Sequence, residues 1–138
     1  QSVSFQADAL DALARKDLDA LASLEKTVPE IAVFQNAYGD LDTVLDALKG
    51  HEMLDQACID ISQVRRGLSA EQISWYCDLG ETHGLNYHTG LVFGIYSLKR
   101  DQLLVRGGRY DHVGESFGRA RAATGFSADL KTLVRLAN

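Results

Sequence analysis

Residues 81–96, ETHGLNYHTGLVFGIY, combine side chains that could bind a small molecule at the start of a strand. Gly84 and Gly90 permit close backbone approach or a positive φ. Tyr87 and His88 lie between them and offer hydrogen-bond donors and acceptors. Such groups could orient a ligand in a pocket. Composition alone favours the simpler interpretation, a structured turn that leads into a strand.

Residues 106–111 form a second polar segment, Arg-Gly-Gly-Arg-Tyr-Asp. Gly107 and Gly108 leave backbone N–H groups accessible, and the neighbouring Arg109 could contact an anion. The segment lacks the Gly-Lys-Ser/Thr ending of a phosphate-binding P-loop. By itself it favours the exit from a hairpin, with arginines in solvent.

Other catalytic or metal chemistries have little support. His83 and His88 are five residues apart with no further histidine or cysteine nearby, which is poor support for a metal site. Gly-x-Ser-x-Gly does not occur. Cys58 and Cys77 lie in apolar patterns typical of buried, reduced thiols rather than a disulfide. We therefore expect neither a metal nor a cofactor.

Composition indicates a cytoplasmic globular protein. The chain has 138 residues, of which 46% are hydrophobic and 24% charged. It contains no run of 18 apolar residues and no visible signal peptide. It begins at Gln1 rather than Met, which suggests a processed chain or a fragment. The first 66 residues carry 12 acidic and 6 basic residues and would repel a phosphate backbone. We expect no nucleic-acid or membrane partner.

The apolar pattern divides the chain into a helical module at 1–66 and a strand-rich part at 67–138. Helical spacing up to about residue 68 predicts five short amphipathic helices. Asp17 and either Asp40 or Asp42 are expected N-caps, and Pro29 is expected in the first turn of the third helix.

After residue 67 the period changes to two, which predicts strands at 73–79, 91–98 and 103–106. The second and third should form a hairpin that ends at Gly107–Gly108. A fourth strand at 122–127 and a helix at 129–136 would follow. This order indicates an α+β fold. The strand at 91–98 is apolar on both faces, as in a central position, and would need cover from missing N-terminal sequence, a partner, or both.

Three segments together resemble the C-terminal part of a class II histidyl-tRNA synthetase catalytic domain. They are Gly-Leu-Asn-Tyr-His-Thr-Gly-Leu-Val-Phe at 84–93, Gly-Gly-Arg-Tyr-Asp at 107–111 and Ala-Thr-Gly-Phe-Ser at 123–127. The match covers roughly residues 72–136. The resemblance implies that 67–138 is part of a class II synthetase-like antiparallel sheet with a C-terminal helix, and that 1–66 corresponds to the helical insertion of the family.

The chain departs from that family where its chemistry is expected. The resemblance implies six replacements. This chain has His83 where the family has the catalytic Arg, Asn86 where it has Asp, and His88 where it has Tyr. It has Gly94 and Lys131 where the family has Glu, and Thr132 where the family has the ATP-contacting Arg. Adenylate formation needs cations around developing negative charge, and neither neutral imidazole nor a hydroxyl replaces guanidinium. We therefore expect no catalytic residue.

A synthetase-like chain without this machinery resembles the regulatory subunit of ATP phosphoribosyltransferase. The resemblance implies a short-form catalytic subunit as partner, a homodimer within a hetero-oligomer, and a part in the feedback control of histidine biosynthesis by histidine. It implies more N-terminal sequence, so that this chain is a fragment. The candidate residues of a histidine-like pocket are Tyr87, His88, Gly90, Gly107, Gly108, Arg109 and Tyr110. A divergent histidyl-tRNA synthetase and an interaction module that shares only the fold are the alternatives.

Overall fold

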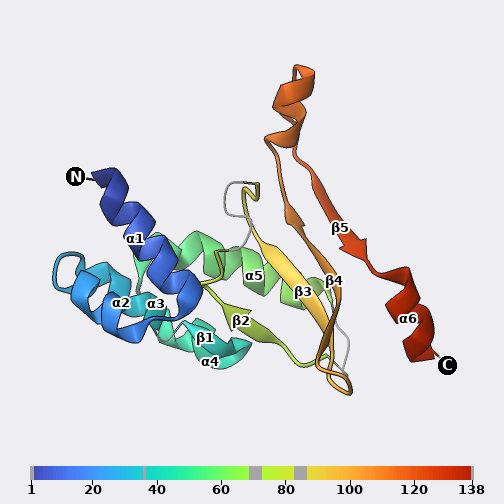
Figure 1. Ribbon diagram of the computed structural model, residues 1–138, viewed down its shortest axis with the longest axis horizontal. Coiled ribbons are helices and arrows are strands. Elements are labelled where there is room, and N and C mark those ends of the chain that lie inside the picture. Colours follow the sequence, from blue (N-terminus) through green and yellow to red (C-terminus); the bar gives the residue numbers. More distant parts are fainter. Residues whose placement is uncertain (1, 36, 69–72, 83–86, 138) are drawn as a thin grey trace. The chain divides into compact units, whose positions relative to one another are not determined.

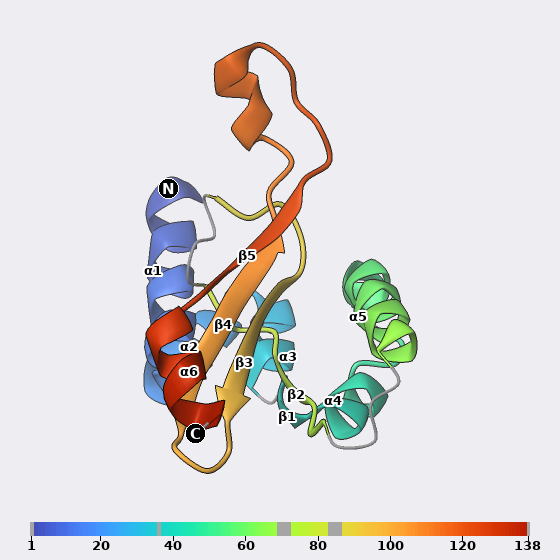
Figure 2. The ribbon, with the colours of Figure 1, turned by 90° about the vertical axis from the view of Figure 1, so that its right-hand side faces the viewer.

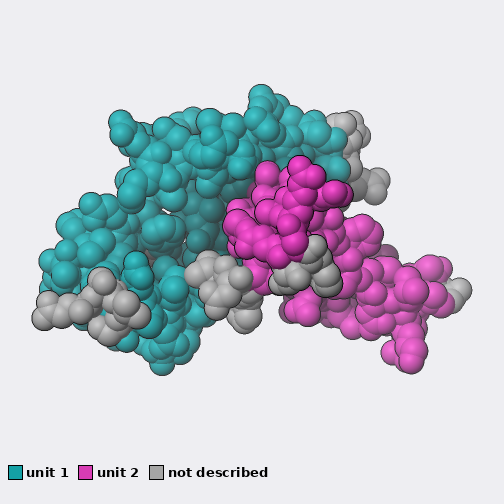
Figure 3. Space-filling view, turned by 90° about the horizontal axis from the view of Figure 1, so that it is seen from above, with its two compact units in different colours: residues 1–83 teal, residues 84–138 magenta. Residues whose placement is uncertain are grey.

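The computed structural model describes residues 2–35, 37–68, 73–82 and 87–137 of the chain (Figure 1). The chain divides into two compact units, residues 1–83 and 84–138 (Figure 3). The first has a two-stranded antiparallel sheet and the second a three-stranded one. Helices and antiparallel strands in this order confirm the α+β class. None of the helices in the described ranges is long and apolar enough to cross a membrane.

The first unit consists mainly of short helices. Its elements are α1 (Ser2–Arg15), α2 (Leu18–Glu25), η1 (Pro29–Ile31), α3 (Ala32–Gln35), β1 (Tyr38–Asp40), α4 (Leu41–Ala47), η2 (Glu52–Leu54), α5 (Asp55–Gly67) and β2 (Tyr76–Asp78). The predicted caps are confirmed: the Asp17 side chain accepts from the Ala20 N–H, and the Asp40 side chain accepts from the N–H groups of the next turn. Each cap satisfies donors that the first helical turn leaves unpaired.

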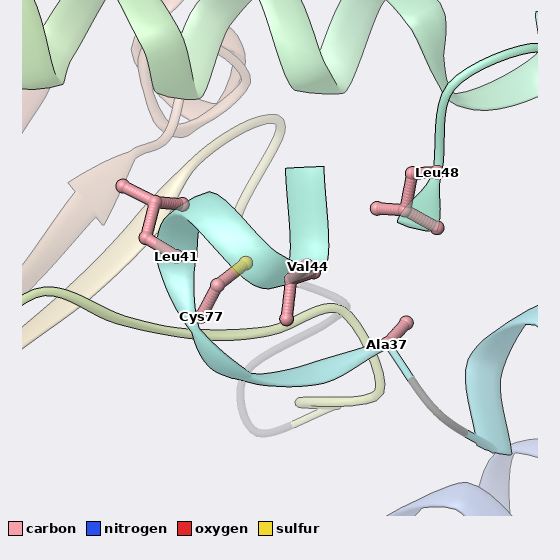
Figure 4. Packing of buried hydrophobic residues seen from close by; sticks show 5 residues of the cluster. All are labelled: Ala37, Leu41, Val44, Leu48 and Cys77. Carbon is pink, nitrogen blue, oxygen red and sulfur yellow. The ribbon is translucent and has the colours of Figure 1, made fainter. Parts of the chain in front are cut away.

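Two apolar clusters hold the helices of this unit together. One consists of Ala37, Leu41, Val44, Leu48 and Cys77 (Figure 4). The other contains Ala12, Leu21 and Ile31. Leu41 and Val44 of α4 and its C-cap residue Leu48 recur three and four residues apart, so they lie on one helix face. Each such side chain contributes about 1.5–3 kcal/mol when it is fully buried.

The predicted strand at 73–79 is present in its central part, as β2 (Tyr76–Asp78). β2 pairs with β1, with Tyr38 opposite Asp78 and Asp40 opposite Tyr76. The spacing of apolar residues predicts a third helix that stops near Tyr38–Gly39, but α3 ends at Gln35. Gly39 has a φ of 135° and the chain is extended there. The alternation was correct, because Cys77 is buried in the cluster of α4. The expected domain boundary between residues 66 and 67 stays a prediction.

The second unit is a meander followed by a helix. Its elements are β3 (Val92–Ser97), β4 (Gln102–Arg109), η3 (Val113–Phe117), β5 (Thr124–Ala128) and α6 (Leu130–Ala137). The strands run antiparallel in the order β3-β4-β5, and α6 follows directly at the end of β5 (Figure 2). The predicted hairpin, fourth strand and terminal helix are therefore confirmed.

Two expectations for this sheet are wrong. The hairpin does not end at Gly107–Gly108, because both glycines lie inside β4. A Cβ atom on Gly107 would lie 2.8 Å from Phe93 Cζ and 2.8 Å from Phe126 Cβ, so the missing side chain makes room for neighbouring strands. β3 was expected to be central, but β4 is central and β3 is at an edge. Phe93, Ile95 and Tyr96 of β3 are exposed in this chain.

Candidate functional site

The two polar segments that the sequence singled out meet at one end of the β3–β4 hairpin. The Thr89 N–H donates to the Arg109 carbonyl oxygen at 2.9 Å, and the Arg109 N–H donates to the Leu91 carbonyl oxygen at 3.0 Å. These bonds continue the strand pairing beyond Val92. The candidate residues before β3 and those at the end of β4 are thereby held side by side.

His88 packs directly on Gly108. A Cβ atom on Gly108 would lie 2.8 Å from His88 Nδ1, so only glycine leaves space for the imidazole here. Within the described part of the chain, His88 Nδ1 is buried and has no hydrogen-bond partner. The ring is therefore fixed by packing rather than by a hydrogen bond at that nitrogen. Gly90 has a similar role, because a Cβ atom there would lie 3.2 Å from Arg109 Cδ.

Tyr87 connects the two segments through its ring. Its centroid lies 5.2 Å from that of His88 in an edge-to-face arrangement, and 5.2 Å from that of Tyr110 in a tilted one. Both separations are typical of favourable aromatic pairs. Tyr110 in turn lies against the backbone of Gly125, where a Cβ atom would overlap the tyrosine hydroxyl. All three sequence segments of the resemblance thus contribute to one site.

Asp111 organises this site, although it was not among the predicted residues. Its carboxylate accepts from Arg109 Nε at 2.7 Å and from the Ala123 N–H at 3.0 Å. Its own N–H donates to Thr89 Oγ1 at 3.0 Å. The Ala123 N–H, and next the Arg109 side chain, lower the pKa of this carboxyl below its ordinary value. Asp111 is the last residue of the Gly-Gly-Arg-Tyr-Asp segment, which was the available signal.

The charges here suit recognition of a polar ligand better than stabilisation of a triphosphate. Arg109 is half exposed, but its guanidinium is already paired with Asp111. The accessible groups are the exposed Tyr87 and the half-buried Tyr110 and His88. Among the described residues no group of three histidine, cysteine or acidic side chains could hold a metal ion.

The positions that depart from the synthetase pattern are only partly described. His83 and Asn86 lie outside the described residues. Gly94 is within β3. Thr132 is buried at the start of α6, and its hydroxyl donates to Asp129 Oδ2 at 2.9 Å. The Thr132 hydroxyl is therefore engaged by the residue that precedes α6.

Known proteins resemble this chain over nearly its whole length. The family model described as histidyl-tRNA synthetase matches residues 2–133. The ATP phosphoribosyltransferase regulatory subunit of Pseudomonas syringae pv. syringae (strain B728a) is 42% identical over 137 residues. The proteins of the same name from Stutzerimonas stutzeri and Pseudomonas entomophila (strain L48) are 41% and 37% identical.

Each of these alignments covers 91% of this chain and 35% of the relative. The chain thus spans about a third of the length of the curated relatives it matches. The family match includes the helical unit, which the sequence motifs alone did not identify. The chain belongs to the histidyl-tRNA synthetase family, and its curated relatives include ATP phosphoribosyltransferase regulatory subunits.

Proposed function

We propose that the full-length protein is a non-catalytic regulatory subunit of ATP phosphoribosyltransferase. The main support is that relatives 42% identical over 91% of the chain carry that name. In this role the protein would bind a short-form catalytic subunit in the cytoplasm. It would support the first step of histidine biosynthesis and take part in its feedback inhibition by histidine, as a homodimer within a hetero-oligomer.

The chemistry of the described residues supports a role without catalysis. Transfer reactions of nucleotides rely on preorganised cations. Thr132 supplies a hydroxyl where the resemblance implies an arginine, and that hydroxyl is held by Asp129. The Arg109 guanidinium is held by Asp111. Neither position therefore offers an unpaired cation to a triphosphate.

The candidate site would take part in recognition of histidine. Tyr87, His88 and Tyr110 would provide ring contacts and polar groups, and Gly90, Gly107 and Gly108 would keep the backbone accessible to neighbouring side chains. Arg109 would be positioned by Asp111 rather than free to move. The resemblance implies that the rest of the pocket comes from elsewhere in the full-length protein.

A divergent histidyl-tRNA synthetase is the second candidate, because the matching family model carries that description. It would need cations at the positions of His83 and Thr132 from another source. A synthetase would also catalyse histidine-dependent pyrophosphate exchange, which a regulatory subunit would not.

Reconstitution tests the proposal. The full-length protein is mixed with a short-form catalytic subunit, and product formation from ATP and phosphoribosyl pyrophosphate is assayed with and without histidine. We expect a complex, higher activity than the catalytic subunit alone, and inhibition by histidine. No complex and unchanged activity would overturn the proposal, and histidine-dependent pyrophosphate exchange by the protein alone would favour the synthetase.

A further inference from the structure

The helical unit contains a cleft of about 330 Å³ beside its two-stranded sheet. This volume is at the lower end of the range for pockets that bind small molecules. Most of the lining is apolar, and it includes Leu13, Leu21 and Phe34. Leu21 is buried, whereas Leu18, Tyr38 and Tyr76, which also line the cleft, are exposed.

The strand register explains why both tyrosines lie on the cleft side. Side chains directly opposite each other in an antiparallel pair share a face, as do residues two apart in a strand. Tyr38 is opposite Asp78, and Tyr76 is opposite Asp40. Cys77 points to the other face, where it is buried in the core cluster. The outer face of this ribbon therefore carries two tyrosines and two aspartates, with Tyr38 48% and Tyr76 70% exposed.

The lysine that lines the cleft is already neutralised. Lys16 Nζ lies 2.7 Å from Asp78 Oδ1 and 5.8 Å from the centroid of the Tyr38 ring. Its ammonium group is thus held between a carboxylate and an aromatic face, which are both favourable partners for a cation. A partner that enters the cleft would therefore contact Lys16 as a lining residue whose positive charge is already paired.

Negative charge surrounds the exposed apolar residues. Asp17 and Asp19 flank Leu18 in the sequence, and Asp40 is opposite Tyr76 in the sheet. In the ranges that the structure describes, these three carboxylates form no ion pair. Residues 1–83 as a whole carry 15 acidic and 6 basic residues. A basic surface would therefore be attracted to this side of the unit.

We propose that this cleft docks an aromatic or branched aliphatic side chain that a partner protein presents next to lysine or arginine. The inference rests on the proposed function, so the partner is the short-form catalytic subunit. Tyrosines supply large contact area with a polar tip and are enriched among residues that dominate binding energy. The surrounding carboxylates would attract the lysine or arginine of the partner and fix the orientation in which the partner binds.

The test uses the full-length protein and the short-form catalytic subunit in a titration by calorimetry. Tyr38→Ala and Tyr76→Ala should each weaken binding by about tenfold or more, as expected for central interface residues. Asp19→Asn should weaken binding less than the tyrosine variants do and reduce the salt dependence of the affinity; stopped-flow mixing should show a lower association rate constant. Met53→Ala is the matched control, because Met53 is exposed in the same unit but does not line the cleft; it should bind like the wild type.

The outcomes separate this inference from the proposed function. If the wild type does not bind the catalytic subunit, both fail. If the wild type binds and the tyrosine variants bind equally well, the docking surface is wrong and the proposed function stands. If the variants keep their affinity but change the oligomeric state in sedimentation velocity, a second copy covers the cleft and the inference is overturned. If the tyrosine variants have a lower Tm but an unchanged affinity, the protein's own chain covers the cleft, and the inference is also overturned.

Discussion

A hydrogen bond joins Asp111 to Ala123, the residues at the two ends of the connection between β4 and β5: the Ala123 N–H donates to Asp111 Oδ1 at 3.0 Å. The neighbouring Tyr110 N–H donates to the Ala123 carbonyl oxygen at 2.9 Å. The two ends of the connection are thus joined at its base. Because the other carboxylate oxygen holds Arg109, one residue fixes both the connection and the candidate site.

Asp111→Asn should lower the Tm at neutral pH, because an amide weakens the bond to Arg109. The lowered pKa of Asp111 means that the ionised carboxyl favours the folded state. This stabilisation is present above the ordinary carboxyl value of 3.8 and is lost as the pH falls through the lowered pKa. The difference in Tm between wild type and variant should therefore become smaller as the pH falls through the lowered pKa of Asp111. Asp101→Asn, in the exposed turn after β3, is the control, and a difference that persists at low pH would contradict this account.

Gly108→Ala should disrupt the candidate site. The new methyl group would lie 2.8 Å from His88 Nδ1 and 2.9 Å from the Leu91 carbonyl oxygen, so the loop before β3 must move. Overpacking of this kind costs about 1–3 kcal/mol. Hydrogen–deuterium exchange of the β3 and β4 amides should become faster. Gly67→Ala, which meets nothing within 4 Å, should leave this exchange unchanged.

Leu41→Ala should lower the free energy of unfolding of the helical unit by about 2–5 kcal/mol, because it leaves a cavity in a tightly packed cluster. Leu41 is 1% exposed. Urea denaturation of the 138-residue chain can be followed by the fluorescence of Trp75, its single tryptophan, which packs against that cluster. Met53→Ala should change the free energy by less than about 0.5 kcal/mol, as surface substitutions usually do. Equal effects from both variants would show that the cluster is not the core of the unit.

Histidine should bind weakly or not at all to the 138-residue chain in a calorimetric titration, and more tightly to the full-length protein. The reason is that the resemblance implies pocket residues outside this chain, which spans 35% of the length of its relatives. Glutamine is a suitable control ligand. Tight binding by the chain alone would show that the pocket is complete within these residues.

Periodicity predicted the elements where burial is regular and failed where the partner lies far away in the sequence. The helix at 41–47 was found because Leu41, Val44 and Leu48 repeat at helical spacing and are all buried. The alternation around Cys77 gave the correct buried face of β2. Nothing in a three-residue segment such as 38–40 indicates that it pairs with 76–78, because so short a strand has no period of its own.

The same distinction applies to the candidate site. The candidate residues came from segments whose composition and order resemble a family, and the structure brings them together. Asp111 was missed as the organising residue because its role depends on the Ala123 N–H, 12 residues further along the chain. The apolar character of β3 predicts that its faces are covered in the full-length protein, and this stays a prediction. The pattern did not tell which strand of this sheet is central, because that depends on the pairing of β4 with β5.

Two hydrogen bonds join Tyr110 and Asp111 to Ala123 at the base of the β4–β5 connection. Because of them, the alignment of β4 with β5 does not depend on the length of the connection. Residues 112–121 therefore form a loop whose length can change without changing the register of the sheet, because the hydrogen bonds at the base of the loop set that register. Gly118, which follows η3 within this segment, is exposed and has a φ of 95°. A fluorophore or an affinity tag inserted at this point would give a handle on the protein that leaves Arg109 and Tyr110 in place.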